Sequence, residues 1–115
     1  MRNLDREFHA MIVYLIYKHG REMWIGKIRR LLKEIQIKYF EMYDKSLFDE
    51  VRTAEYRMMW NLVDGHVLTV RKVEDDYMFS FYYDVSIKIN IKTIKKVLKK
   101  KVRRLITQTI RDNQS

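Results

Sequence analysis

The 115-residue sequence contains no cysteine and no proline, and it has three glycines. Without cysteine the chain forms no disulfide, no thiolate metal site and no cysteine nucleophile, which suits a reducing compartment. The glycines stand alone at positions 20, 26 and 65, so no glycine-rich phosphate-binding loop is present. These absences exclude enzymes that depend on a cysteine nucleophile, a thiolate metal site or a glycine-rich phosphate-binding loop.

Long hydrophobic runs are also missing. The longest, "AMIVYLIY" at residues 10–17, spans eight residues, whereas a membrane-spanning helix needs about 20. We therefore interpret it as a core helix and expect no membrane partner. Asp5 and Glu7 interrupt any basic signal-peptide region at the N-terminus, so we expect an intracellular protein. With 47% hydrophobic residues, the chain is expected to form one domain with a modest core.

The residues that would support catalysis are scattered. His9, His19 and His66 lie in different segments without metal-ligand spacing. The one dense carboxylate group, "EDD" at residues 74–76, is more typical of turn chemistry than of a metal site. We expect no enzymatic activity, no cofactor or metal, and no small-molecule substrate.

The positive charge is concentrated at the C-terminal end. Residues 1–87 hold fourteen Lys and Arg and fourteen Asp and Glu, whereas residues 88–115 hold ten Lys and Arg against Asp112 alone. The last 28 residues therefore account for the whole net charge of +9. Such asymmetry favours a polyanion or an anionic surface as partner over a merely solubilising tail.

Apolar residues recur at three- and four-residue steps in four segments, which predicts four helices. Their expected ranges are 4–19, 24–35, 47–63 and 91–110. Asn3 is a suitable N-cap for the first helix, and Gly65 is expected to end the third in the left-handed conformation. Residues 36–46 follow no clear period and are expected to extend the second helix before giving way to a loop.

Alternating apolar residues predict strands between the third and fourth helices. Residues 66–73 and 77–85 flank the short polar tip at 74–76, so an antiparallel hairpin is expected. Residues 86–92 also alternate and are either a third strand or the start of the last helix. Trp60, on the third helix, is expected to be at least partly buried.

The stretch "VRTAEYRMMWNLVDGHVLTV" at residues 51–70 resembles the end of a recognition helix and the start of a wing. With the order of elements over residues 4–85, it resembles the winged helix-turn-helix DNA-binding family, and the composition is similar to that of small crenarchaeal-virus proteins. The resemblance implies an α+β fold, a winged helix-turn-helix domain at residues 1–90 with three helices plus a β-hairpin wing. A basic amphipathic helix at residues 91–115 is then added, packed on the domain or at a dimer interface. The lack of Pro and Cys also suits a hyperthermophile.

In that family the third helix enters the major groove of DNA, and the wing lies against the backbone or in the minor groove. Arg can grip guanine, Thr can contact the thymine methyl, and Tyr can reach phosphate. Because the wing tip is acidic, we expect it to stay off the DNA. Lys27, Arg29 and Arg30 are further candidates for backbone contacts. The expected DNA-binding residues are Arg52, Thr53, Tyr56, Arg57, Arg71, Lys72, Lys95, Lys96, Lys99, Lys100 and Arg103.

We expect a transcriptional regulator that binds double-stranded DNA as a homodimer, in the host cytoplasm if the protein is viral. The last helix suits dimerisation, phosphate binding or an anionic membrane surface, although its apolar side lacks the aromatic residues of interfacial helices. The alternative function is a protein-interaction module on the same scaffold, such as a viral factor that binds a host protein. The two differ in whether Arg52, Arg57 and the Lys-rich helix form one continuous positive face. A basic helix that points away from the third helix would favour the protein-interaction module.

Overall fold

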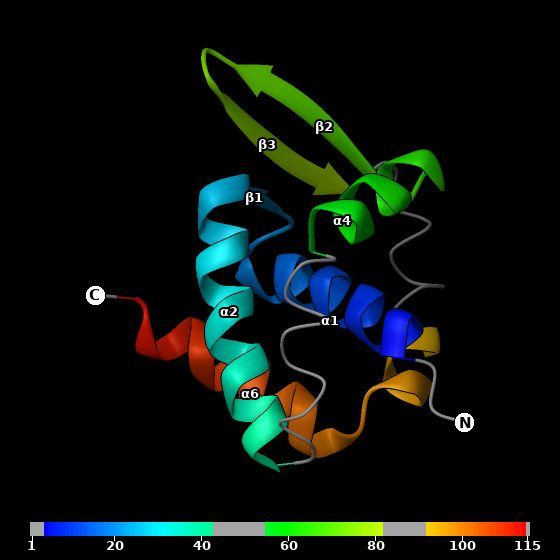
Figure 1. The fold of residues 1–115 in the computed structure, drawn as a ribbon, viewed down its shortest axis with the longest axis vertical. Helices are drawn as coiled ribbons and strands as arrows, with labels where there is room; N and C mark the ends of the chain where they lie inside the picture. Colours follow the sequence, from blue (N-terminus) through cyan, green and yellow to red (C-terminus); the bar gives the residue numbers. More distant parts are fainter. Residues whose placement is uncertain (1–3, 43–54, 82–91, 115) are drawn as a thin grey trace.

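The computed structural model describes residues 4–42, 55–81 and 92–114 (Figure 1). Within these ranges the fold is α+β, with five helical segments and a three-stranded antiparallel sheet. The elements in chain order are α1 (Leu4–His19), β1 (Glu22–Trp24), α2 (Ile25–Met42), α4 (Glu55–Asp64), β2 (Leu68–Val73), β3 (Asp76–Phe81), a short helix at 92–97, and α6 (Lys100–Asp112). None of the helices described is long and apolar enough to cross a membrane.

Helix α1 is the centre of the molecule. Every residue from Ala10 to Ile16 is buried, because a helix that is apolar all round must be covered on all sides. Helix α4 and the β2–β3 hairpin lie on one side of α1, and α6 lies on the other (Figure 1). The interpretation of residues 10–17 as a core helix is confirmed, as are the predicted bounds of α1 at 4–19.

The second and third predicted helices agree in their described parts. Helix α2 continues to Met42, which confirms an extension beyond residue 35. Helix α4 covers the second half of the range predicted at 47–63, whose first half lies outside the described residues. The prediction that Gly65 is left-handed is wrong. His66 takes the left-handed conformation instead, with φ 58°. The amide of Gly65 still donates to the carbonyl of Asn61 at 2.9 Å and closes the last turn.

The sheet has the strand order β1–β3–β2. Strand β3 is central and pairs antiparallel with both neighbours, so that Phe79 lies between Met23 of β1 and Val70 of β2. The predicted hairpin is confirmed, with a turn at Glu74 and Asp75 that is one residue shorter than the predicted tip. The predicted strand residues 82–85 and the alternatives for 86–91 lie outside the described residues.

Strand β1 was not predicted from the sequence, because three residues are too few to establish a period of two. It forms where α1 ends, with Gly20 and Arg21 at positive φ and both amides donating to the carbonyl of Ile16. The chain then reverses and the edge of β3 supplies the hydrogen bonds of the new strand. Tertiary contact, not local propensity, therefore makes this strand.

Trp60 of α4 packs against the inner face of the sheet. Its ring centroid lies 5.9 Å from that of Tyr77 and 5.7 Å from that of Phe79, and both pairs are edge-to-face. The side chain is 37% exposed, so the prediction that Trp60 is partly buried is confirmed. These aromatic contacts hold α4 against the hairpin.

The prediction of one continuous helix over residues 91–110 is wrong. Residues 92–97 are helical, Leu98 and Lys99 interrupt the helix, and α6 begins at Lys100. Lys99 has an extended backbone with ψ 151°. The bend lets the apolar side chains of both segments, including Ile94 and Ile106, reach the core, whereas a straight helix about 30 Å long would leave one end of its stripe in solvent.

Gln36 of α2 is an exception in the core. Its side chain is fully buried, and neither its amide nitrogen nor its oxygen has a hydrogen-bond partner. A buried polar group without partners costs about 1–3 kcal/mol. Gln36→Met, which keeps the length and removes the polar atoms, should therefore raise the free energy of unfolding by about that amount in urea denaturation.

Gln108 provides the control for this prediction. It lies on the exposed face of α6 and donates to the Asp112 carboxylate at 2.7 Å, so Gln108→Met should change stability by no more than about 0.5 kcal/mol. A Gln36→Met variant no more stable than the wild type would show that the buried amide is satisfied in solution.

Candidate nucleic-acid interface

Helix α6 is anchored by one apolar face. Val102, Ile106 and Ile110 recur every four residues and are buried, so they form one stripe, which packs on α1 and α2. At the C-terminal end the Asn113 amide donates to the Glu34 carboxylate of α2 at 3.1 Å and to the carbonyl of Thr109 at 2.8 Å. The orientation of α6 is thus set by both packing and hydrogen bonding.

Burial of that stripe turns the charged side of the C-terminal segment outward. Residues 92–114 contain nine Lys and Arg and one acid, Asp112, for a net charge of +8. All nine cations are exposed except Arg103, which is partly buried. We call these nine side chains the C-terminal basic surface: Lys92, Lys95, Lys96, Lys99, Lys100, Lys101, Arg103, Arg104 and Arg111.

The sequence-based site list overlaps this surface but is incomplete there. Lys95, Lys96, Lys99 and Lys100 are exposed as expected. Four further cations of this segment are absent from the sequence-based candidates. The spacing of apolar residues could have identified them, because each lies off the apolar stripe of the same segment. They are Lys92, Lys101, Arg104 and Arg111.

A groove runs along one side of α6. It has a volume of about 410 Å³ and lies between α6 and Tyr14 of α1. Its lining is Tyr14, Lys100, Arg103, Arg104, Thr107, Gln108 and Arg111. Four of these seven side chains are cationic and none is acidic, so the groove suits an anionic ligand.

The face formed by α4 and the hairpin has a different charge. Arg57, Arg71 and Lys72 are exposed there, and the ammonium of Lys72 lies 6.0 Å from the Tyr77 ring centroid. Residues 55–81 as a whole carry three Lys and Arg against five Asp and Glu, a net charge of −2. Arg52, Thr53 and the side chain of Tyr56 lie outside the described residues.

The candidate residues thus fall on two sides of the molecule. In Figure 1, α4 and the hairpin lie above α1, and α6 lies below it. Among the described residues, Arg57 and the cations of α6 therefore belong to helices on opposite sides of α1. Lys27, Arg29 and Arg30 belong to the first turns of α2, the end of that helix next to β1.

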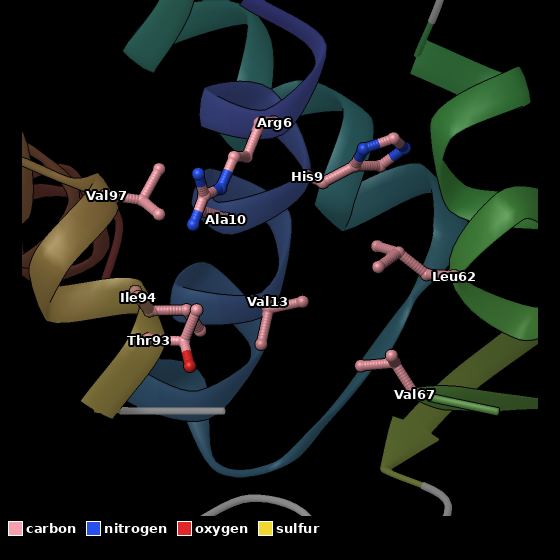
Figure 2. A pocket seen from close by; sticks show the side chains of 9 residues that line it. All are labelled: Arg6, His9, Ala10, Val13, Leu62, Val67, Thr93, Ile94 and Val97. Carbon is pink, nitrogen blue, oxygen red and sulfur yellow. The ribbon is translucent and has the colours of Figure 1, made fainter. Parts of the chain in front are cut away.

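A second, smaller pocket lies between the two sides. It has a volume of about 130 Å³, and Figure 2 shows Leu62 and Val67 facing α1 from one side and the 92–97 helix closing the other. Its walls are mainly apolar, and it is too small for a nucleotide or a cofactor of similar size. Among the described residues no group of three or more His, Asp or Glu side chains is placed to hold a metal ion.

His19, at the end of α1, adds little positive charge at neutral pH. Burial lowers the pKa of its imidazole, and the nearby charge of Lys27 lowers it further, although a hydrogen bond with the backbone of Glu22 acts in the opposite direction. The imidazole is therefore mainly neutral at pH 7. The basic character of the protein comes from Lys and Arg.

Comparisons of the chain with protein-family models, with curated proteins and with solved structures gave no match. Its function is therefore inferred from its own residues.

Proposed function

We propose that this protein binds double-stranded DNA through the C-terminal basic surface. The observation that carries the proposal is the burial of the apolar stripe of α6 against α1 and α2. A basic helix fixed in this way holds its Lys and Arg side chains outward in a stable arrangement. Phosphate neutralisation by such a surface releases condensed counterions, which is the main source of sequence-independent affinity for DNA.

The scaffold is consistent with this proposal. Among the described residues, the order of helix, strand, two helices and hairpin, with the sheet order β1–β3–β2, is compatible with a winged helix-turn-helix layout. Our proposal departs from the usual use of that layout, because the residues of α4 and the hairpin carry a net negative charge. A transcriptional regulator would use α4 to recognise the DNA base sequence. Among the described residues of α4, that recognition would depend on Arg57.

The same burial weakens two other roles considered for the last helix. Homodimerisation through the apolar stripe would compete with packing inside the chain, since Val102, Ile106 and Ile110 are already covered. Insertion into a membrane surface would require the same residues. Phosphate binding uses the opposite face and needs no rearrangement.

Salt dependence tests the proposal. Binding to a random-sequence duplex, followed by fluorescence anisotropy, should weaken about 10³-fold or more between about 50 and 200 mM salt if six or more of the nine cations contact phosphates. Salt-independent binding, or no binding at the lowest salt, would contradict it.

A second candidate function is a protein-interaction module. It is favoured by the position of α4 and the hairpin on the side away from the basic surface, and by the large apolar side chains exposed there. Trp60 of α4 and Val73 of β2 are among these. The DNA-binding candidate depends on the C-terminal basic surface, whereas the protein-interaction candidate depends on the face formed by α4 and the hairpin.

A further inference from the structure

The groove beside α6 differs from the rest of the C-terminal basic surface, because it is a concave site and not a scatter of exposed cations. Its α6 residues follow one another at steps of one or three positions from Lys100 to Arg111, so they form one stripe. At 1.5 Å per residue the stripe is about 16 Å long. Tyr14, which is largely buried, contributes to the groove from α1.

The charges in the groove are not neutralised by its own lining. The nearest acid in sequence is Asp112, which accepts a hydrogen bond from the lining residue Gln108 at 2.7 Å, so the four cations and this acid together keep a net charge of +3. The Nε atom of Arg103 is buried and has no hydrogen-bond partner. Four cations that line one groove repel each other, and an anion bound among them would relieve that repulsion and accept charge-assisted hydrogen bonds.

The α1 side of the groove adds to this positive field. Lys18 holds its ammonium 5.6 Å from the ring centroid of Tyr14 and 5.8 Å from that of Tyr17. The hydroxyl of Thr107 donates to the carbonyl of Arg103 at 3.0 Å, so its proton is already used within the helix. The groups left to meet a ligand are mainly guanidinium and ammonium groups.

We infer that this groove binds several linked phosphate groups at once, and that in the DNA complex these are phosphates of a single strand. The second part rests on the proposed function. A stripe about 16 Å long is several times the rise per phosphate of one DNA strand, about 3.4 Å. A strand that follows the groove brings more than one phosphate within reach of Lys100, Arg104 and Arg111, whereas a single phosphate uses only part of the stripe.

Two double variants that remove the same charge test the inference. Arg104→Gln with Arg111→Gln removes two exposed cations of the groove, and Lys95→Gln with Lys96→Gln removes two exposed cations outside it. All four side chains are exposed, so both variants should fold, which circular dichroism melts will verify. Binding of inorganic tripolyphosphate is measured by isothermal titration calorimetry and binding of duplex DNA by anisotropy, at the same ionic strength.

The groove variant should bind tripolyphosphate about tenfold or more weakly than the wild type, and the control within about twofold, because charge-assisted hydrogen bonds are lost only in the former. Orthophosphate should bind the wild type much more weakly than tripolyphosphate. Equal losses for the two variants would overturn the inference, because net charge alone would then explain binding. A wild type that fails to bind tripolyphosphate would also overturn it.

The DNA measurements separate this inference from the proposed function. If the wild type binds DNA and both variants lose the same affinity for it, the function stands and the groove has no special part in it. If the wild type binds no DNA but the groove variant alone loses tripolyphosphate, the proposed function fails, and the groove is a site for free polyphosphate.

Discussion

Replacing Lys95, Lys96 and Lys100 together with Gln should weaken binding to duplex DNA about 100-fold or more at about 0.1 M salt. It should also make the log–log dependence of affinity on salt shallower by about 2.7, which is three times the contribution of about 0.9 from each phosphate contact. The three side chains are exposed and stand off the apolar stripe, so the fold should be unaffected. Fluorescence anisotropy over a series of salt concentrations measures both quantities.

The matched control removes the same charge from the other side of the molecule. Arg57→Gln, Arg71→Gln and Lys72→Gln change three exposed residues of α4 and β2. This variant has the same net charge but should keep most of the affinity and slope of the wild type. A larger loss in the control than in the Lys variant would place DNA on α4 and the hairpin and overturn our assignment. No loss in either would favour the protein-interaction module.

The second large effect concerns stability. Phe79→Ala should lower the free energy of unfolding by about 3–5 kcal/mol, the usual cost of truncating a buried phenylalanine. Phe79 is 0% exposed, pairs with strands on both sides and packs edge-to-face on Trp60. Since a domain of this size has a total stability of about 5–15 kcal/mol, a large part would be lost. Urea denaturation, followed by circular dichroism, gives the value.

The neighbouring Met78 supplies the control. It points to the opposite face of the sheet and is only partly buried, so Met78→Ala should cost clearly less, about 1 kcal/mol. Equal costs at the two positions would mean that the inner face of the sheet is not part of the core.

Because α4 is held to the sheet through Trp60, the Phe79→Ala variant should also show altered tryptophan fluorescence before unfolding.

Those features that depend on neighbours in the chain were predictable from the sequence. The bounds of α1, the β2–β3 hairpin and the outward position of Lys95 and Lys96 all follow from the spacing of apolar residues, because that spacing decides which side of an element avoids water. The concentration of positive charge after residue 87 needed only a count. The polyanionic partner that this charge indicates stays a prediction.

Features that depend on distant contacts were decided by the tertiary structure. Strand β1 exists because Met23 meets Phe79 across 56 positions of sequence, and no local pattern encodes that meeting. The last helix breaks at Leu98 and Lys99. The break lets the apolar residues of the 92–97 helix and those of α6 each pack on the compact core. Periodicity defines the stripe but not the curvature of the surface that it covers.

The location of the candidate site was decided in the same way. Arg57 and the C-terminal cations are both candidate DNA-binding residues from the sequence, which leaves open whether they form one continuous positive face. In the folded chain α1 lies between them (Figure 1). Each helix has its apolar face turned to the core, so helices on opposite sides of a central helix must direct their polar faces apart. The amphipathic pattern thus determined that each basic face meets solvent, and only the packing around α1 decided that the two faces point in different directions.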